Sequence, residues 1–344
     1  MKSMAHRLRG ALSPLNWLSW LFGAALLGVV IVIVLRFSEE REFVRLLEQA
    51  HPWALLAGVA LQAGTYFAEG EVWRDVARAA GYRLRPGVTY QLGLAKLFID
   101  QAVPTGGISG TVLYVQGLER LGVDRSATMA GVVITTFSYY GSYALCLGAA
   151  LIIATLAMPL NWSIVAAIVT FLVVSLALSL VLLLHAGRQS SPVIQAAERI
   201  APLRKLTVLL NSADPVLVRQ LRLNVRATAW QILIVLLDAA TLWVLLLAIG
   251  APARLEAVFT CFMISSVVRS LSIFVPGGLG IFDAASVIML ESFGTPMAAA
   301  LSATLLFRGL SFWAPMVPGV LIARRVVKGR GAFATTAARE QCRE

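Results

Sequence analysis

The chain has 344 residues, of which 58% are hydrophobic and only 14% are charged. Soluble globular proteins carry about 25% charged residues, so this composition excludes a soluble enzyme and indicates a polytopic membrane protein. The net charge of +11 lies in short segments beside apolar runs, which favours the positive-inside rule over a nucleic-acid partner. Three cysteines without CxxC spacing and three scattered histidines indicate neither a disulfide framework nor a metal site, and we expect no cofactor.

Six apolar runs are long enough to cross a bilayer core of about 30 Å. In chain order they are 17–35, 53–73, 127–157, 162–184, 227–249 and 296–322. The first run is followed by charged residues and not by a small-residue cleavage site, so we expect it to remain as a span.

The charges of the connecting segments predict the orientation of the spans. Basic residues exceed acidic ones in 186–226 and in the tail 324–344, which we place in the cytoplasm together with 1–16. Segment 36–52 lacks this excess and is placed outside. Residues 186–226 also mix basic with apolar side chains, as amphipathic surface helices do, although a plain cytoplasmic connector explains them equally well.

Two further apolar segments, 88–119 and 258–293, are interrupted by proline and glycine at Pro104–Gly110 and Pro276–Gly280. Half-segments of about fifteen residues reach only about 22 Å as helices, so neither half can cross the membrane. At membrane depth, backbone N–H and C=O groups outside a helix are tolerated only where protein or a water-filled cavity surrounds them. We therefore predict two re-entrant pairs of half-helices.

The two breaks belong to a sequence repeat. The matching residues at equal distances after the two prolines are Leu118, Glu119 and Gly122 after Pro104, and Leu290, Glu291 and Gly294 after Pro276. Three full crossings separate the breaks, and an odd number turns them toward opposite sides of the membrane. The predicted fold is all-α, with six transmembrane helices and two re-entrant pairs in an inverted repeat of 17–157 and 158–323, which supports alternating access.

Charged residues inside the apolar segments are candidates for function, because each costs about 2.5–3.5 kcal/mol at a helix centre. They are Lys96, Asp100, Asp238, Arg269, Asp283 and Arg308. The breaks add residues that let the backbone turn and aim half-helix N-termini at an anion. These are Pro104, Gly106, Gly107, Pro276, Gly277, Gly278 and Gly280.

Three of the charged candidates have plain structural explanations. Lys96 and Asp100 lie four residues apart, so on a helix they share a face and can neutralise each other. Asp283 follows the second break and can cap backbone N–H groups at the start of the next half-helix.

Arg269, Arg308 and Asp238 come from different segments. If they meet, two guanidiniums and one carboxylate keep a positive charge that could hold a phosphate or another anionic headgroup bidentately. The alternative is that each arginine snorkels to the membrane interface.

Two motifs carry a resemblance, DQAVPTGGISG at Asp100–Gly110 and FVPGGLGIFD at Phe274–Asp283. They resemble the flippase-like membrane proteins related to the transmembrane domain of bacterial lysylphosphatidylglycerol synthases, over about residues 15–328. The resemblance implies a polytopic fold that moves or handles lipids across the cytoplasmic membrane. The aminoacyl-transferase domain of the full synthases has no counterpart here, so lysyl transfer is not implied. The first motif is similar to that of a subgroup encoded beside hopanoid biosynthesis genes, which would make the cargo a polycyclic triterpenoid lipid.

Three functions follow as hypotheses. The leading one is a lipid translocase without covalent chemistry, and liposome flipping would test it. An intramembrane headgroup transferase would need a donor site with positioned carboxylates, and no Asp-x-Asp pair is present. A membrane scaffold that recruits a lipid-biosynthesis enzyme through 186–226 would lose its function when that segment is deleted. The expected partners are membrane lipids, with that enzyme in the scaffold case.

Overall fold

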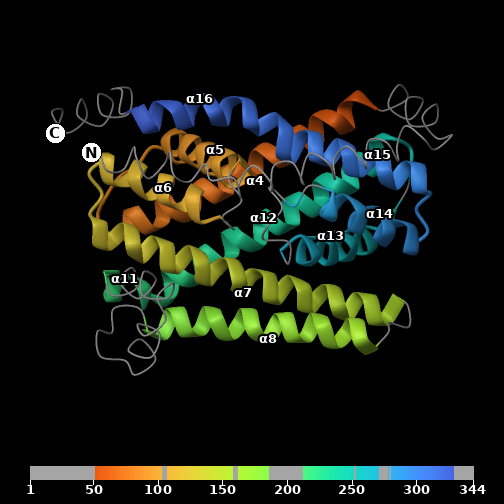
Figure 1. Ribbon diagram of the computed structural model, residues 1–344, viewed down its shortest axis with the longest axis horizontal. Helices are drawn as coiled ribbons and strands as arrows, with labels where there is room; N and C mark the ends of the chain where they lie inside the picture. Colours follow the sequence, from red (N-terminus) through yellow and green to blue (C-terminus); the bar gives the residue numbers. More distant parts are fainter. Residues whose placement is uncertain are drawn as a thin grey trace, which may run out of the picture. The chain divides into compact units, whose positions relative to one another are not determined.

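The computed structural model describes residues 51–102, 107–157, 162–185, 212–251, 253–270, 278 and 280–328. Every regular element within those ranges is helical, which confirms the all-α class (Figure 1). The predicted span 17–35, residues 186–211 of the connecting segment and residues 329–344 of the tail lie outside the described residues.

The described residues form eleven α-helices and one π-helix. They are α4 (Pro52–Ala79), α5 (Pro86–Ala102), α6 (Ile108–Arg120), α7 (Arg125–Ala157), α8 (Trp162–His185), α11 (Pro215–Val218), α12 (Leu221–Ala248), α13 (Leu255–Ser270), α14 (Ile281–Ser292), α15 (Met297–Arg308), the π-helix η2 (Gly309–Trp313) and α16 (Ala314–Lys328). By length and composition, the described part of the chain has three helices able to cross a membrane, at Arg125–Leu156, Leu221–Ala248 and Met297–Arg324. These coincide with three of the predicted spans.

Two helices extend into segments that the sequence predicts as polar connections. α4 continues past residue 73 to Ala79, and α12 begins at Leu221, inside the predicted connector 186–226. The reason is an interhelical contact, because the buried carboxylate of Asp75 on α4 accepts hydrogen bonds from Arg226 and Trp230 on α12. These charged residues thus form contacts between two helices, and the helices continue through them.

Two compact units divide the chain. The first unit comprises Met1–Gln62, Leu97–Gly110 and Ala239–Val317, and the second comprises Ala63–Lys96, Thr111–Asp238 and Pro318–Glu344. Each unit draws on both predicted repeats, because long helices such as α4 and α12 contribute residues to both units.

The core of the first unit is aromatic. The rings of Phe262 on α13, Phe282 on α14 and Phe307 on α15 lie 5.7–6.0 Å apart between centroids. A buried hydrogen bond of 3.1 Å joins the hydroxyls of Ser286 on α14 and Thr304 on α15. Helices α13, α14 and α15 therefore pack against one another (Figure 1).

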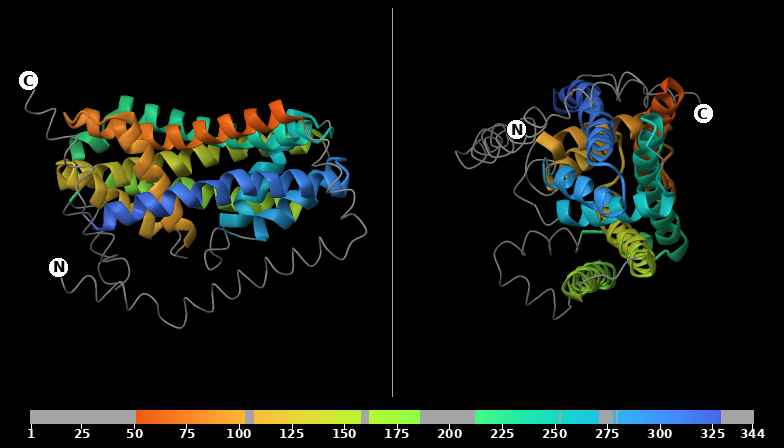
Figure 2. Two further views of the ribbon diagram at one scale, coloured as in Figure 1. Left: turned by 90° about the horizontal axis from the view of Figure 1, so that it is seen from above. Right: turned by 90° about the vertical axis from the view of Figure 1, so that its right-hand side faces the viewer.

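In the second unit, Trp73 of α4 stacks on Tyr114 of α6 with the ring centroids 4.5 Å apart. Both side chains are fully buried, and the Cα of Gly131 on α7 lies against the Trp73 ring where a larger residue would collide. Helix α8 lies alongside α7 over much of its length (Figures 1 and 2).

Helices α4 and α12 contact each other within each unit. In the first unit, the backbone N–H of His51 just before α4 donates to the carbonyl of Ala248 at the end of α12 (2.9 Å), and Gly58 lies against Leu245. In the second unit, Asp75 near the end of α4 contacts Arg226 near the start of α12.

Candidate functional site

Helices α5 and α6 fold back on each other as a hairpin. Close to the break, the Asp100 carboxylate accepts the backbone N–H of Gly110 (2.8 Å). Further away, the Tyr114 hydroxyl donates to the carbonyl of Thr89 (3.1 Å). We call α5, the break and α6 together the first hairpin, and the helices on either side of a break its half-helices.

Helices α13 and α14 form a second hairpin in the same way. The Arg269 stem lies against the backbone of Gly278 beside the break, and Phe262 packs on Phe282 further along. The four half-helices have 17, 13, 16 and 12 residues, or about 18–26 Å of helix. Each is shorter than a bilayer core of about 30 Å.

The two hairpins end in the same local structure. The N–H of Val123 donates to the carbonyl of Leu118 (3.1 Å), and the N–H of Thr295 donates to that of Leu290 (3.0 Å). The glycine in each turn, Gly122 or Gly294, has a positive φ of 86° or 89°. This is the Schellman helix stop, and the match observed in the sequence at these positions therefore has a structural basis.

Helices α4 and α12 also correspond. Each has 28 residues and stops at a positive-φ glycine, Gly81 or Gly250, with the same backbone bonds. In this register Gln62 corresponds to Gln231 and Glu69 to Asp238. This match is visible only when the helices before the two breaks are compared, and the similarity of the breaks alone does not reveal it.

A buried ion pair closes the second hairpin onto α15. Arg308, only 5% exposed, donates from Nε to Asp283 Oδ1 (2.7 Å) and from Nη2 to the carbonyl of Gly278 (2.9 Å). Asp283 Oδ2 accepts the N–H of Gly280 (2.8 Å), so the predicted capping contact is present. The same carboxylate therefore caps α14 and neutralises a guanidinium that is out of contact with water.

Two arginines share one ring at this break. The guanidinium carbon of Arg308 lies 4.8 Å from the centroid of Phe282, and that of Arg269 lies 5.7 Å from it. Gly278 has a φ of +61°, and a side chain there would collide with the Arg269 stem. Glycine is thus required twice at this position, by its backbone conformation and by the arginine beside it.

The remaining predicted residues fall into three groups. Pro104, Gly106, Pro276 and Gly277 lie outside the described residues. Gly107 turns the first break with a φ of +86°. In the second unit, Lys96 Nζ lies 3.2 Å from Glu69 Oε1, and Asp238 accepts the hydroxyl of Thr65 (3.3 Å). The structure therefore brings Arg269, Asp283 and Arg308 together, and the carboxylate that Arg308 contacts is Asp283, whereas Asp238 belongs to the other unit.

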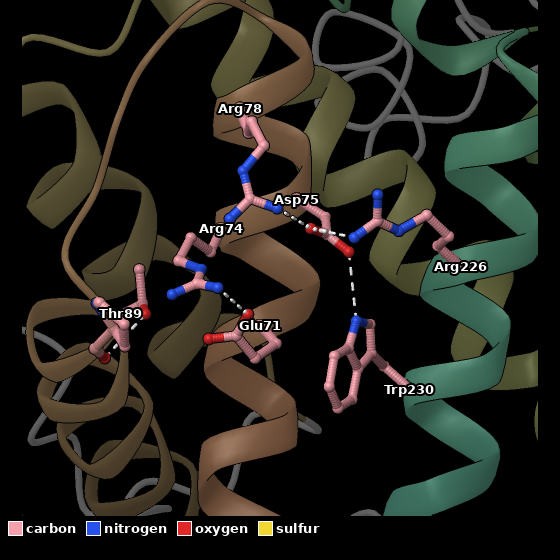
Figure 3. A network of polar contacts seen from close by, with 8 residues as sticks. Glu71, Arg74, Asp75, Arg78, Thr89, Arg226 and Trp230 are labelled. Carbon is pink, nitrogen blue, oxygen red and sulfur yellow. Dashed lines mark hydrogen bonds and ion pairs between the residues drawn. The ribbon is translucent and has the colours of Figure 1, made fainter.

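Sequence reasoning also missed a charged network on α4 (Figure 3). Glu71 pairs with Arg74 (2.7 Å), and the buried Asp75 receives Arg78 (3.0 Å), Arg226 (3.1 Å) and Trp230 (3.1 Å). The i,i+3 spacing of acid and arginine could have revealed the first two pairs. The contacts to α12 had no sequence signal. Within the described ranges, no group of His, Cys, Asp or Glu could hold a metal ion.

Long apolar helices combined with two short helix hairpins and a buried charged cluster define a helical integral membrane protein. The chain belongs to the family described as the lysylphosphatidylglycerol synthase TM region, which it matches over residues 17–319. No curated protein matches the chain. The membership agrees with the resemblance carried by the two motifs and indicates a membrane protein of lipid handling.

Proposed function

We propose that the protein is a lipid translocase of the cytoplasmic membrane that moves a phospholipid or a hopanoid-type lipid between leaflets without covalent chemistry. Both termini lie in the cytoplasm, and the two hairpins enter the membrane from opposite sides. The observation that carries the proposal is the pair of corresponding hairpins, whose half-helices are too short to cross a bilayer and whose breaks hold charged side chains.

The physical argument concerns the path of a polar headgroup. A headgroup in the hydrocarbon core needs polar partners, because an unsatisfied polar group there costs several kcal/mol. Broken helices offer glycine-rich backbone and charged side chains where continuous helices offer apolar surface. An inverted repeat presents such a site to each side in turn, which is the basis of alternating access.

A flipping assay tests the function directly. The purified full chain is reconstituted into liposomes that contain a fluorescent phospholipid, and in a second series a fluorescent hopanoid. A membrane-impermeant reductant is then added outside. We expect loss of fluorescence beyond the outer-leaflet fraction for the transported lipid, compared with protein-free vesicles. If the fluorescence of the inner leaflet stays protected from the reductant for every lipid tested, as in protein-free vesicles, translocation is refuted.

A labelling experiment tests the inverted arrangement. Val112 and Ala284 occupy corresponding, exposed positions near the starts of α6 and α14. Each is replaced by cysteine in a chain whose own Cys146, Cys261 and Cys342 are changed to alanine. We expect an impermeant thiol reagent to reach position 112 from the cytoplasm and position 284 from outside. Labelling of both from one side would remove the inverted repeat and with it the alternating-access scheme.

A further inference from the structure

We propose that Arg78 of α4 and Arg226 of α12 together bind a phosphate group, supplied by the headgroup of an anionic phospholipid. Both arginines belong to the second unit, and both contact the buried carboxylate of Asp75 (Figure 3). The inference does not depend on translocation, because a lipid held at this site need not be the lipid that moves.

The charges around Asp75 do not balance. Its Oδ1 accepts hydrogen bonds from Nη1 of Arg78 (3.0 Å) and Nη2 of Arg226 (3.1 Å), and its Oδ2 accepts the indole N–H of Trp230 (3.1 Å). Two guanidiniums thus meet one carboxylate. The other acid of the network, Glu71, is paired with an arginine of its own, Arg74, at 2.7 Å. The cluster therefore keeps one surplus positive charge, which an anion would offset.

The two guanidiniums are accessible, whereas the carboxylate between them is not. The side chains of Arg78 and Arg226 are 51% and 59% exposed, against 2% for that of Asp75. In the described part of the chain each guanidinium contacts Asp75 through one nitrogen, and an arginine has further N–H donors on the same planar group. Asp75 therefore holds the two cations from the buried side, and a ligand can approach from the exposed side.

The arrangement suits a phosphate group. Both arginines contact the same oxygen of Asp75, so the two guanidiniums are neighbours and one ligand can contact both. A planar guanidinium matches the oxygens of a phosphate bidentately, and a tetrahedral phosphate has oxygens for a second guanidinium as well. Trp230 fixes the other oxygen of Asp75. The two arginines are thus positioned before a ligand arrives.

The position of the cluster along the helices favours a lipid as the source of the phosphate. Arg78 lies in the last turn of α4, and Arg226 lies in the second turn of α12, which is apolar and long enough to cross a membrane. The ends of such helices lie at the depth of the lipid headgroups. Basic pockets between helices bind anionic headgroups there, and indole rings such as that of Trp230 are enriched at the same depth.

Binding to the detergent-solubilised full chain tests the site. Calorimetry compares a short-chain phosphatidylglycerol, the diacylglycerol with the same acyl chains, and inorganic phosphate. The test variants are Arg78→Gln and Arg226→Gln, and each leaves Asp75 with one arginine and with Trp230. The matched control is Arg120→Gln, the same change at an exposed arginine in the last turn of α6 in the same unit.

We expect phosphatidylglycerol to bind more tightly than inorganic phosphate, and diacylglycerol to bind far more weakly. Each test variant should weaken phosphatidylglycerol binding about 10- to 100-fold, because a charged hydrogen-bond donor is lost, while Arg120→Gln leaves the affinity unchanged. Arg226→Lys keeps the charge without the planar fork and should give an intermediate loss. If the glutamine variants fail to fold, the lysine variant decides, and an affinity equal to that of the native chain would then contradict the site.

Three results would overturn the inference. Equal affinities of the test variants and the control would show that anionic lipid is attracted by the basic surface in general or binds elsewhere. Equal binding of diacylglycerol and phosphatidylglycerol would show that the acyl chains, and not the phosphate, are recognised. Inorganic phosphate that binds as tightly as phosphatidylglycerol would identify a free-phosphate site. Because each measurement concerns binding alone, its outcome is distinguishable from success or failure of the flipping assay.

Discussion

The first and second hairpins have half-helices of similar length, the same kind of stop and glycine-rich breaks, yet different groups hold their breaks together. In the first hairpin the Asp100 carboxylate accepts the N–H of Gly110, so this bond joins one half-helix to the other. In the second, Asp283 caps its own half-helix, and Arg308 from α15 reaches into the break. The described contacts thus differ in charge, with a carboxylate at the first break and a carboxylate–guanidinium pair at the second.

The second hairpin is also joined to an unusual helix. Arg308 immediately precedes the π-helix Gly309–Trp313, which continues into α16 with Pro318 in its interior. Helix α7, which follows the first hairpin, is an α-helix from Arg125 to Ala157. π-turns and prolines loosen the regular ladder of a helix. The comparison therefore predicts that substitutions at the second break disturb the protein more than those at the first.

Asp283→Ala should have the largest effect. It leaves the buried guanidinium of Arg308 without its carboxylate, at a cost of about 3–5 kcal/mol in the free energy of unfolding. A dodecyl sulfate titration followed by circular dichroism measures this. Asp283→Asn keeps an acceptor for the Gly280 N–H but removes the charge, so we expect it to remain strongly destabilised. If the asparagine variant matches the native chain, capping and not the ion pair stabilises the break.

Gly278→Ala comes next, and Gly250→Ala is its control. Both glycines have positive φ, +61° and +72°, so each alanine costs about 1–2 kcal/mol in backbone strain. Only at Gly278 does the new methyl group collide with a neighbour, the Arg269 stem, and such overpacking adds about 1–3 kcal/mol. The difference between the two variants in the same titration isolates the packing of Arg269. Equal destabilisation would mean that the stem moves aside freely.

Asp100→Ala should have a smaller effect, about 1.5–3 kcal/mol, because it removes a hydrogen bond to a charged acceptor. Asp100→Asn retains an oxygen acceptor for the Gly110 N–H and should lie closer to the native chain. If Asp100→Ala lowered the free energy of unfolding more than Asp283→Ala, the prediction that the second break is the more sensitive one would be wrong.

Gly117→Ala should change stability least. The added methyl would lie 2.5 Å from the end of the Leu92 side chain, which is flexible and can shift. Alanine also gains up to about 1 kcal/mol over glycine in a helix interior, so we expect a net change within about 1 kcal/mol. In the double variant with Leu92→Ala the collision is gone, and a double-mutant cycle gives the coupling. A coupling of zero would show that these half-helices do not pack through Gly117.

Much of the architecture was predictable, since it depends on local composition. The apolar runs at α7, α12 and α15–α16 are long helices as predicted, and the breaks lie between short helices. The capping role of Asp283 was predictable, because the residue lies three positions after Gly280 in the sequence, and the hydrogen bond from the Gly280 N–H confirms it. The partner of Arg308 was not predictable. The sequence offers both Asp238 and Asp283 as carboxylates that could pair with Arg308. The packing of α14 on α15 brings Asp283 to Arg308.

The sequence by itself determined the membrane class, the positions of the breaks and the repeat, because hydrophobicity, proline and glycine act on the chain locally. Tertiary structure decided which charges meet. It set Arg308 against Asp283, placed Arg269 on the same ring, and extended α4 and α12 through the Asp75 contacts. The reason is physical, since a buried charge is stabilised only by what surrounds it in space, and residues far apart in the chain supply those surroundings.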